Sequence, residues 1–280
     1  MEGPLFTITI LGAAGKMGMR IHNNLIKEKH TLLLCEKSPE GIELLNKKGV
    51  EVTDMKEAVP TSDFVIMAVP DAVLGKISHD VVPRMKENGT FIMLDPAAAY
   101  AQEIALRDEC TFVVTHPCHP QLFVEQETPE ARADMFGGIA AKQDIVVALL
   151  QGDEDRFQIA VEICKWMFAP VVKAHRVTVE QMAILEPAMA EVVGASCVTL
   201  LKEALDEAVH RGVPEEAARA FILGHINIEL AILFKSSNPF SDAAYRAIQY
   251  GKKKIFKDNW REVFEESSIK EVLKMMLHPE

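Results

Sequence analysis

The sequence predicts an α/β fold in which a doubly wound parallel sheet is followed by an all-α C-terminal domain with a long central helix. Short apolar strands alternate with helical patterns along the first 176 residues, the order that produces parallel sheets covered by helices. From Thr178 onward the pattern is helical, without a strand period. A chain of 280 residues is long enough for two domains. We therefore expect one domain over residues 1–176 and a second over 177–280.

The strands expected in the first domain are short and apolar. Ser62–Pro70, SDFVIMAVP, is almost continuously apolar, as in strands that are buried on both faces of a sheet. Pro117–Gly138 shows no period, and loops of this length in compact domains are usually functional. The pattern predicts strands at 7–11, 31–35, 50–52, 62–70, 90–94, 111–115, 144–150 and 170–173, with helices at 17–26, 41–48, 73–85, 102–107 and 154–168.

A glycine-rich turn joins the first strand to the first helix in FTITILGAAGKMG, Phe6–Gly18. Its glycines are spaced GxxGxxG, a variant of the GxGxxG pattern of Rossmann-type dinucleotide-binding domains. Glycines permit a tight turn and the close approach of a ligand. The first helical N–H groups, aided by the helix dipole, would bind its diphosphate. The residues expected to bind the cofactor here are Gly12, Ala13, Ala14, Gly15, Lys16, Met17 and Gly18.

Three further residues are expected to bind the dinucleotide. Glu36 ends the second strand 18 positions after Gly18, where an acidic side chain binds the ribose hydroxyls. Its charge would repel a 2′-phosphate, which favours NAD over NADP, although the neighbouring Lys37 weakens that argument. Val69 and Asp71 lie at the carboxyl end of a buried strand, where open α/β sheets bind ligands, and are expected to line the nicotinamide side. The alternative for Asp71 is a helix N-cap.

Charge and cysteine content limit the class of protein. A net charge of −11 and a pI near 5.4 argue against nucleic acid or an anionic membrane surface as a partner. Five scattered cysteines without a CxxC pair predict a reducing, cytoplasmic location. The N-terminus enters the first strand without a basic region, so no signal peptide is expected. Met182–Leu201 could imitate a membrane span, but Glu186 and Glu191 make that interpretation costly.

The second domain is expected to consist of helices. Thr178 and Gln181 form a capping box at its start. Met182–Leu201, MAILEPAMAEVVGASCVTLL, is apolar nearly all round and should be buried, either as the axis of the domain or in a dimer interface. We expect a homodimer built by this domain. Helices are expected at 179–211, 214–234 and 241–255, with an amphipathic tail after Trp260.

Glu186 and Glu191 stand out in this apolar helix. An unpaired buried carboxylate is costly, so each must be paired, protonated or bound to a cation. On an ideal α-helix the two residues lie about 140° apart. Pro187 frees the carbonyl of Ala183 and kinks the axis, which would turn the glutamates toward a shared cavity. A structural pairing of each glutamate and a role as metal ligand or acid-base group both stay open.

THPCHP, Thr115–Pro120, presents two histidines at the carboxyl edge of the predicted sheet. His116 is placed at the end of the sixth expected strand, near the nicotinamide, and the prolines hold the backbone extended. His116, Cys118 and His119 could ligate zinc, but residues so close in sequence rarely let all three side chains reach one ion. One histidine with a glutamate and open water positions suits a catalytic metal better. Cys118 is not needed as a nucleophile, and His225 is interpreted as a core residue rather than a catalyst.

Six stretches of the sequence point to a known family: GAAGKMG, THPCHP followed by LF, FGGIAAKQDIVVALLQG, HRVTVEQMAILEP, GHINIE and SDAA. Through them the whole chain resembles the bacterial D-apionate oxidoisomerases, within the β-hydroxyacid and 6-phosphogluconate dehydrogenase-like superfamily. The superfamily usually has an acid-base lysine on the long helix, ahead of an asparagine. This sequence has no lysine there before Lys202 and carries Glu186 and Glu191 instead. The departure disfavours a plain hydroxyacid dehydrogenase and favours a metal-assisted variant.

The resemblance implies that NAD oxidises a secondary hydroxyl of a small branched sugar acid and that the carbon skeleton then rearranges by a 1,2-shift. A divalent metal, zinc or magnesium, would polarise the oxygens involved. On this hypothesis His116 and Glu191 bind the metal, and His119 or Glu186 moves protons. The first alternative is NAD-dependent oxidation of another small polyhydroxy acid without rearrangement. The second is a non-catalytic protein that binds NAD.

Overall fold

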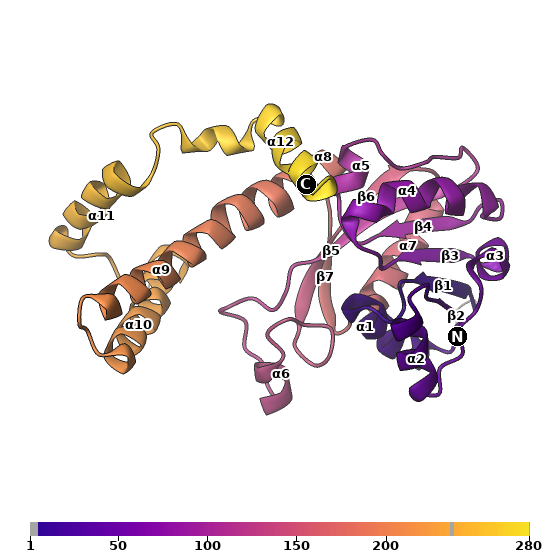
Figure 1. Ribbon diagram of the computed structural model, residues 1–280, viewed down its shortest axis with the longest axis horizontal. Helices are drawn as coiled ribbons and strands as arrows, with labels where there is room; N and C mark the ends of the chain where they lie inside the picture. The colour runs from indigo at the N-terminus through magenta and orange to yellow at the C-terminus, as the bar shows by residue number, and fades with distance from the viewer. Residues whose placement is uncertain (1–4, 236–237, 280) are drawn as a thin grey trace. The chain divides into compact units, whose positions relative to one another are not determined.

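The computed structural model describes residues 5–235 and 238–279. The chain forms two compact units: unit 1 comprises Met1–Ile184 with Lys270–Glu280, and unit 2 comprises Leu185–Ile269. Unit 1 contains a β-sheet with flanking helices, whereas unit 2 is helical (Figure 1). The last part of the chain therefore belongs with the sheet. The domain boundary expected near residue 176 stays a prediction.

Unit 1 is built around a seven-stranded sheet. Its strands are β1 Thr7–Leu11, β2 Thr31–Cys35, β3 Phe64–Met67, β4 Thr90–Met93, β5 Thr111–Pro117, β6 Gln143–Gln151 and β7 Val171–Arg176. They lie in the order β2-β1-β3-β4-β5-β6-β7. The strands β1 to β5 are parallel, and Ile8 of β1 lies opposite Leu32 of β2 and Phe64 of β3. Central residues such as Ile10 and Ile66 are fully buried, which confirms the expected α/β fold.

The sheet departs from the expected parallel arrangement at β6. This strand pairs antiparallel with β5, and His116 lies opposite Val146, while β7 is parallel to β6. A parallel connection needs a crossover, usually a helix, that carries the chain to the other end of the sheet. Residues 118–142 instead form a loop with the five-residue helix α6, Pro129–Ala133, and Cys118 N bonds Asp144 O at 2.9 Å. Because β6 starts at the edge where β5 ends, it runs in the opposite direction.

The helices of unit 1 connect the strands of the sheet. They are α1 Lys16–Leu25, α2 Pro39–Lys47, α3 Met55–Ala58, α4 Asp71–Val81, α5 Ala97–Tyr100, α6, α7 Glu154–Met167, α8 Val179–Ala183 and most of α12, Glu266–Leu277. Several of these helices begin at a residue whose side chain accepts a hydrogen bond from the first helical turn. At the start of α7, for example, the Asp153 carboxylate accepts from Arg156 N. The capping box expected from Thr178 and Gln181 is confirmed at α8.

The helix expected at 102–107 is wrong, because these residues form turns and irregular structure. The Asp95 carboxylate accepts from Ala97 N at 2.7 Å, so the helix in this region, α5, starts before the expected one. It ends at Tyr100, and Gln102 has a left-handed backbone with φ 58°. An α-helix cannot continue through that conformation. The run of three alanines is thus helical, and the more polar segment after it is not.

The strand expected at 50–52 is also wrong. It is reduced to a single bridge between Leu34 and Val52. Because only Val52 of this segment pairs with β2, the segment is not one of the seven strands of the sheet. His116 therefore lies on the fifth strand of the chain rather than the sixth, although it keeps its expected place near the carboxyl end of that strand.

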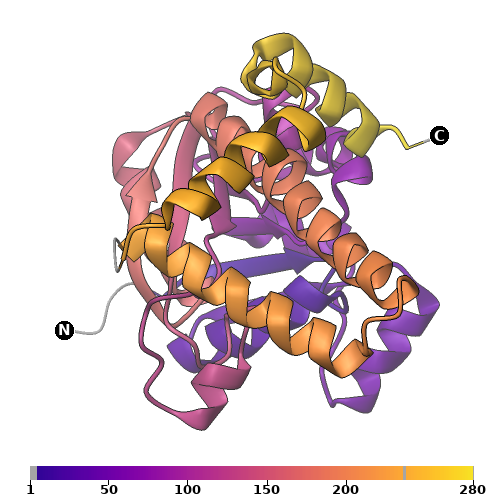
Figure 2. The same cartoon turned by 90° about the vertical axis from the view of Figure 1, so that its left-hand side faces the viewer.

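Unit 2 consists of helices, as the sequence predicts. The helix α8 continues as a π-helical segment, η4 Ile184–Ala195, and then as α9, Ser196–His210. The helices α9 and α10, Glu215–Lys235, contact each other (Figure 2). The remaining elements are α11 Asp242–Ile255, the 3-10 helix η5 Trp260–Phe264 and the first residues of α12. The helices expected at 214–234 and 241–255 are confirmed to within about one residue.

The apolar helices of unit 2 are largely exposed in the single chain. Four large apolar side chains of α9 and α10 are between 65% and 72% exposed: Val198, Phe221, Leu233 and Phe234. The helical stretches Val179–His210 and Glu215–Lys235 are long and apolar enough to cross a membrane by length and composition, a test that helices of soluble proteins also pass. The burial expected for Met182–Leu201 is not seen in this structure. The dimer interface that was expected to cover this stretch stays a prediction.

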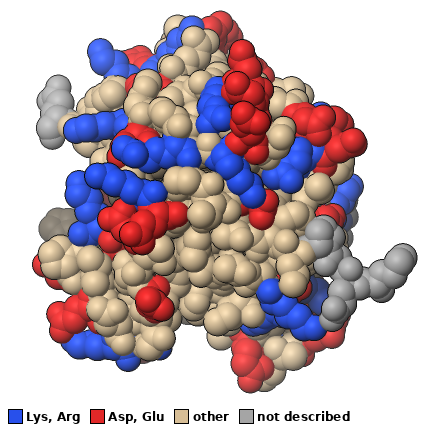
Figure 3. Space-filling model, turned by 90° about the vertical axis from the view of Figure 1, so that its right-hand side faces the viewer, with Lys and Arg blue, Asp and Glu red and all other residues tan. Residues whose placement is uncertain are grey.

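One face of unit 1 carries charges of both signs. Figure 3 shows Lys and Arg side chains interspersed with Asp and Glu side chains on this face. Opposite charges in unit 1 also form ion pairs, such as Lys86 with Asp63 at 2.6 Å and Arg84 with Asp80 at 2.9 Å. On this face the charged side chains therefore occur in mixed groups rather than in a patch of one sign.

Candidate functional site

Glycine is required at two of the three glycine positions of the motif: Gly12, in the turn between β1 and α1, and Gly18, in the first turn of α1. Gly12 has φ +78°, and a Cβ on it would lie 2.3 Å from Ala68 O. A Cβ on Gly18 would lie 2.3 Å from Gly12 O, so α1 packs directly on the turn. Gly15 has an ordinary φ of −66° at the N-cap of α1 and is exposed. Its missing side chain leaves space above the helix terminus, where a ligand can approach the backbone.

The N-terminus of α1 has the features of an anion-binding site. Gly15 provides no side-chain cap, and the first turn contains Lys16 but no acidic residue. The first N–H groups of a helix have no acceptors within it, and the positive end of the dipole lies there. Gly12 N and Ala13 N both bond Cys35 O, at 3.0 and 3.2 Å, which fixes the turn against β2. A dinucleotide diphosphate fits this terminus.

Glu36 lies beside the turn, at the end of β2. Its Oε2 accepts from Ala14 N at 3.1 Å, and its Oε1 accepts from Lys37 N and Ser38 N, both at 2.9 Å. Burial alone would raise the pKa of Glu36, but these hydrogen bonds and the Ser38 hydroxyl outweigh it and lower the pKa. The carboxylate is therefore ionised at neutral pH. It can accept ribose hydroxyls, and it would repel a 2′-phosphate.

Three predicted cofactor residues have side chains that build the turn. Ala13 is fully buried, so it can meet a ligand only through its backbone groups. Met17 is partly buried and packs against the hydrophobic core. Val69 follows β3, and its Cγ1 lies 3.2 Å from the place that a Cβ on Gly12 would take. Val69 thus borders the turn on the side of β3, next to the space expected to hold the nicotinamide half of the cofactor.

Three ionisable side chains lie at the carboxyl ends of neighbouring strands. Asp71 follows β3, Asp95 follows β4, and His116 lies near the end of β5. Burial, and then the charge of Asp95, raise the pKa of Asp71 to about 6, while His116 acts in the opposite direction. Asp95 is 7% exposed. No motif marks Asp95 in the sequence, but its position directly after a buried strand is a signal that could have identified it.

The N-cap interpretation of Asp71 is wrong. Asp71 is the first residue of α4, and Pro70 occupies the N-cap. An acidic side chain in the first turn still interacts favourably with the helix dipole. Its carboxyl group is half-buried at the edge of the sheet where ligands of α/β proteins bind. The role of Asp71 beside the nicotinamide stays a prediction.

His116 and His119 each hold their Nδ1 against a backbone carbonyl. His116 Nδ1 bonds Leu94 O at 2.9 Å, and His119 Nδ1 bonds Phe136 O at 2.8 Å. Because a carbonyl can only accept, each Nδ1 donates its N–H, and in the neutral imidazole the lone pair is then on Nε2. The ring centroids lie 6.2 Å apart at 86°. A hydrogen bond from Nδ1 to a backbone carbonyl fixes the orientation of the imidazole ring. Such a bond suits a histidine that acts as an acid-base group or as a metal ligand.

Cys118, between the two histidines, does not have the properties of a nucleophile. Cys118 is exposed at the surface, but partial desolvation of its thiol by the surrounding atoms, and then the charge of Asp144, raise its pKa to about 11. A thiol with that pKa is protonated at neutral pH. All five cysteines of the chain are free: Cys35, Cys110, Cys118, Cys164 and Cys197. This result agrees with the expectation of no disulfide framework.

The π-helical segment η4 changes the relation between Glu186 and Glu191. A π-helix bonds residue i to residue i+5, so residues five apart stand about one turn apart instead of about 140° around the axis as in an α-helix. Pro187, which lacks an N–H, lies inside the segment. Glu186 is half-buried and Glu191 is exposed. The two glutamates therefore share one side of the helix through π geometry rather than through a kink.

The predicted metal ligands and the predicted proton-transfer residues come from different units. His116 and His119 belong to unit 1, and Glu186 and Glu191 belong to unit 2. Within the described part of the chain, no group of three or more His, Cys, Asp or Glu side chains could hold a metal ion. The predicted set has only two protein ligands, His116 and Glu191, with the other positions left to water or substrate. That set stays a prediction.

His225 is satisfied locally on α10. Its Nδ1 bonds Phe221 O at 2.8 Å, and the two rings stack with centroids 3.9 Å apart. The residue is exposed in the single chain, so it is not a core residue there, in contrast to the expectation. The bond to the preceding turn of the helix holds the imidazole on the surface of α10, among the uncovered apolar side chains of that helix.

Both halves of the chain match known protein families. The family described as phosphogluconate dehydrogenase (decarboxylating) C-term matches residues 124–277. The family described as NADP oxidoreductase coenzyme F420-dependent matches residues 7–95. The first match spans more than half of the chain and includes all of unit 2, and the second covers β1 to β4.

Relatives of known identity match the chain over nearly its full length. A D-apionate oxidoisomerase of Pectobacterium atrosepticum is 46% identical over 278 residues, which cover 99% of this chain and 98% of the relative. A D-apionate oxidoisomerase of Blautia hydrogenotrophica is also 46% identical, over 98% of this chain and 97% of the relative. The chain also resembles a solved structure, the semialdehyde dehydrogenase NAD-binding protein from Cupriavidus necator in complex with calcium and NAD. The two sequences are 40% identical, and the TM-score is 0.94. The match covers 98% of this chain and 100% of that chain. The chain therefore belongs to the D-apionate oxidoisomerase family, within the 6-phosphogluconate dehydrogenase-like superfamily.

Proposed function

We propose that this protein is an NAD-dependent oxidoisomerase that acts on a small branched sugar acid of the D-apionate type. The observation that carries the proposal is the 46% identity with D-apionate oxidoisomerases over nearly the whole chain. The glycine turn, the uncapped N-terminus of α1 and the ionised Glu36 provide independent support for NAD. The solved relative from Cupriavidus necator also contains NAD.

The cofactor would extend from the turn toward the middle of the sheet edge. Its diphosphate would bind the backbone N–H groups of Gly12–Gly18 at the start of α1. Its adenosine ribose would bond Glu36, whose charge disfavours NADP. Its nicotinamide would lie beside Val69 and Asp71, after β3. This direction leads from β2 across β1 to β3, the order in which these strands lie in the sheet.

The reaction has an oxidation and a rearrangement. NAD, when bound, accepts a hydride from the carbon of a secondary alcohol. The hydroxyl proton passes to a base, so the oxidation yields a ketone, NADH and a proton. In the shift, a carbon substituent moves with its bonding pair from the neighbouring carbinol carbon to the ketone carbon. The carbinol oxygen loses its proton and becomes the new ketone, and the former ketone oxygen takes up a proton. The second step changes connectivity without net oxidation.

Proton transfer is proposed for His119, with Glu186 as the alternative. The bond from His119 Nδ1 to Phe136 O leaves the lone pair on Nε2, where it can accept the proton of a substrate hydroxyl. Glu186 is half-buried on η4, and a shielded carboxylate can serve the same purpose. Substituting the acting group should lower kcat strongly with little change in NAD affinity. His119→Gln and Glu186→Gln therefore distinguish the two assignments.

A divalent cation is proposed to bind His116 and Glu191 together with oxygens of water or substrate. Such a cation would polarise the ketone oxygen and hold the neighbouring oxygen in place for the shift. Zinc and magnesium are the metals expected from the sequence. The solved relative is a calcium complex, and calcium prefers oxygen ligands, so calcium belongs among the ions to be tested.

A cytoplasmic homodimer is proposed for the assembly. The exposed apolar side chains of α9 and α10 form faces that a soluble monomer would not leave uncovered, and a second copy of unit 2 would cover them. The same helices satisfy the length and composition of membrane spans, but Glu186 and Glu191 would be costly in a lipid core. The five free cysteines agree with a reducing compartment.

The proposed function is tested with purified protein, NAD and D-apionate. NADH formation is followed by absorbance, and the product is analysed by carbon NMR. We expect one NADH per product molecule and a product whose carbon connectivity differs from that of the substrate. A product with the original skeleton would support simple oxidation. Binding of NAD without NADH formation on branched and linear aldonates would support a non-catalytic NAD-binding protein.

A further inference from the structure

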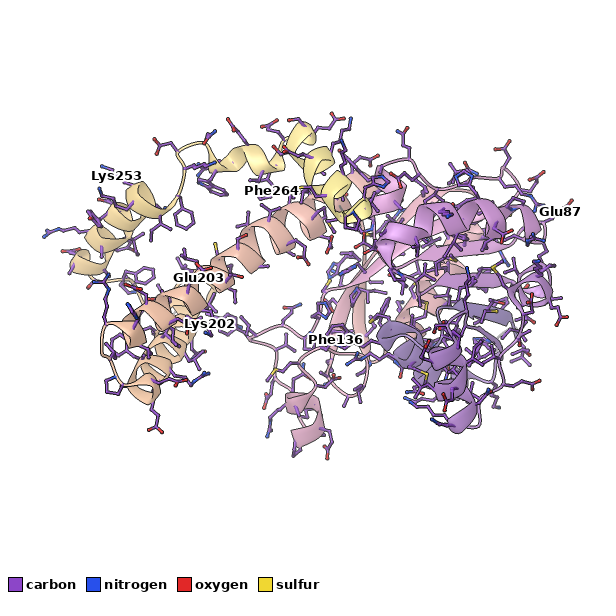
Figure 4. All side chains as sticks on the ribbon, viewed as in Figure 1. Glu87, Phe136, Lys202, Glu203, Lys253 and Phe264 are labelled. Carbon is purple, nitrogen blue, oxygen red and sulfur yellow. The ribbon has the colours of Figure 1, made fainter. Side chains whose placement is uncertain are left out.

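The ring of Phe136 contacts three nitrogen-containing side chains. Phe136 lies in the loop 118–142 between β5 and β6 of unit 1 (Figure 4). Lys16 Nζ lies 4.7 Å and Arg20 Cζ lies 4.3 Å from the ring centroid. The ring of His119 has its centroid 4.9 Å away, at an interplanar angle of 59°. A cation at this distance from an aromatic face is attracted by the ring quadrupole.

Lys16 and Arg20 lie one turn apart on α1, next to the proposed diphosphate site. Within the described part of the chain, the buried Nε of Arg20 has no hydrogen-bond partner. A carboxylate partner would neutralise these cations and compete with a phosphate for them. An aromatic ring attracts cations without neutralising them. Phe136 therefore contacts Lys16 and Arg20 without neutralising their charges.

The backbone of Phe136 orients His119. Its carbonyl accepts the Nδ1–H of His119 at 2.8 Å, which fixes the proton on Nδ1 and the lone pair on Nε2. His119 has φ +59°, a left-handed conformation that few residues other than glycine adopt. Such a conformation persists only where the surrounding structure holds it, and it occurs often at functional sites. One residue thus contacts both the cofactor helix and the proposed proton-transfer group.

The loop that carries Phe136 is fixed by hydrogen bonds. The carboxylate of Asp134 accepts from four backbone N–H groups, and these bonds outweigh burial and lower its pKa. Asn24 of α1 donates its side-chain N–H to Gly138 O at 3.0 Å. The four donors to Asp134 are Gly137 at 3.0 Å, Ile139 at 3.0 Å, Ala140 at 2.9 Å and Ala141 at 3.1 Å. Phe136 therefore lies between two anchored points of the loop.

We propose that Phe136 is a positioning residue that couples the diphosphate end of the NAD site to His119. Its ring holds Lys16 and Arg20 beside the N-terminus of α1, and its carbonyl and ring hold His119 in the orientation that proton transfer requires. The inference rests on the proposed function, because it assumes the diphosphate site and the role of His119. It assigns the loop 118–142 a task in cofactor binding that the glycine motif does not reveal.

The first test compares Phe136→Leu with Phe136→Tyr. Phe136→Leu keeps the backbone carbonyl and an apolar side chain but removes the aromatic face. We expect it to raise the Kd for NAD about five- to tenfold, the effect of one or two cation–π contacts, and to shift the pH profile of kcat. Phe136→Tyr keeps the aromatic face, so it should have the Kd for NAD and the pH profile of kcat of the wild type. Leu122→Ala, at a side chain 78% exposed in the same loop, is the matched control and should change neither.

The second test measures coupling by a double-mutant cycle. The effect of Phe136→Leu on the Kd for NAD should shrink at least threefold in a Lys16→Met background, because the ring then has one cation fewer to hold. Equal effects in both backgrounds would overturn the inference. So would an unchanged NAD affinity and pH profile in a folded Phe136→Leu variant.

The third test needs no variant of Phe136. ADP-ribose carries the diphosphate but lacks the nicotinamide, so it cannot reach His119 through that ring. We expect its binding to the wild-type protein to shift the imidazole NMR signals of His119, and the shift to decrease in Lys16→Met. Unmoved His119 signals in a protein that binds NAD and forms NADH would overturn this inference alone. A wild-type protein that does not bind NAD would overturn the proposed function itself.

Discussion

Ala14 donates its backbone N–H to the carboxylate of Glu36 at 3.1 Å, so the glycine turn after β1 and the acidic residue at the end of β2 form one hydrogen-bonded unit. Gly41 is linked to the same network through Ser38, whose hydroxyl accepts from Gly41 N at 3.1 Å and donates to Glu36 Oε1 at 3.0 Å. The two parts of the dinucleotide motif are thus connected directly. A change at Glu36 should affect cofactor choice more than it affects the fold, because the side chain lies at the surface end of the strand.

Glu36→Gln should weaken the preference for NAD over NADP. The substitution removes the charge that would repel a 2′-phosphate but keeps an acceptor for the ribose hydroxyls. We expect the ratio of kcat/KM for the two cofactors to move toward NADP by about tenfold or more, the effect of roughly 1.4 kcal/mol. Glu40→Gln, an exposed residue of α2, is the control. An unchanged ratio in Glu36→Gln would contradict the assignment of Glu36 to the ribose.

Gly18→Ala should destabilise the protein because its Cβ would lie 2.3 Å from Gly12 O, a backbone atom that cannot move away cheaply. We expect the free energy of unfolding to fall by about 1–3 kcal/mol, as for overpacking in a tight contact. Gly251→Ala is the matched control, since its Cβ would make an ordinary contact at 4.0 Å within α11. That change should raise helix stability by about 0.5–1 kcal/mol. Urea unfolding measures both, and a neutral Gly18→Ala would contradict the packing.

Asp71→Asn should stabilise the protein at neutral pH but not in acid. The pKa of Asp71 is raised by burial and by Asp95 from 3.8 to about 6, so folding favours its protonated form. The contribution of Asp71 to stability is therefore fully present below pH 4 and is lost as the pH rises through about 6. An asparagine has no charge to bury. Urea unfolding of both proteins should show a gain at pH 7 that disappears near pH 4.

The control for this pH dependence is Asp80→Asn, an exposed residue of the same helix. It removes a carboxylate from α4 without removing one from the carboxyl edge of the sheet. Its effect on the free energy of unfolding should not follow the pH dependence seen for Asp71→Asn. A difference between wild type and Asp71→Asn that is the same at pH 4 and pH 7 would show that Asp71 is not held in its protonated form by its surroundings.

Removal of divalent cations should stop turnover if His116 and Glu191 bind a metal. We expect a chelator to abolish activity and one of zinc, magnesium or calcium to restore it. His116→Asn and Glu191→Gln should raise the cation concentration needed for half-maximal activity about tenfold or more. Glu203→Gln on α9 serves as the control, because Glu203 is exposed. Full turnover by protein that elemental analysis finds free of metal would exclude the proposed site.

The apolar faces of α9 and α10 should hold two chains together. Light scattering at micromolar concentration should give twice the mass of the chain. Val198→Asp, at a side chain 66% exposed in the single chain, should shift the protein to monomers, because an unpaired carboxylate in an apolar interface is costly. Leu106→Asp on unit 1, 50% exposed, should not. A monomeric wild type would contradict the dimer, and association with lipid vesicles would point to a membrane instead.

The parts of the fold that depend on residues close together in the sequence could be predicted from it. The strands Thr7–Leu11 and Thr31–Cys35 have the bounds that their apolar runs indicate. The glycine turn and Glu36 are arranged as the motif predicts, because the backbone angles of the turn and the length of the βαβ unit are local properties. The helix expected at 102–107 was misplaced because Asp95 starts α5 earlier and Gln102 takes a left-handed backbone.

The tertiary structure alone decided which distant residues meet. The direction of β6 follows from a loop that returns along the edge of the sheet, and no period within β6 encodes it. The contacts of Phe136 with Lys16 and Arg20, and the effect of Asp95 on Asp71, join segments far apart in the sequence. Local patterns fix which face of each element is apolar. Which other element that face packs against depends on the arrangement that buries the most apolar surface and satisfies the hydrogen bonds of the backbone. That arrangement is a property of the whole chain.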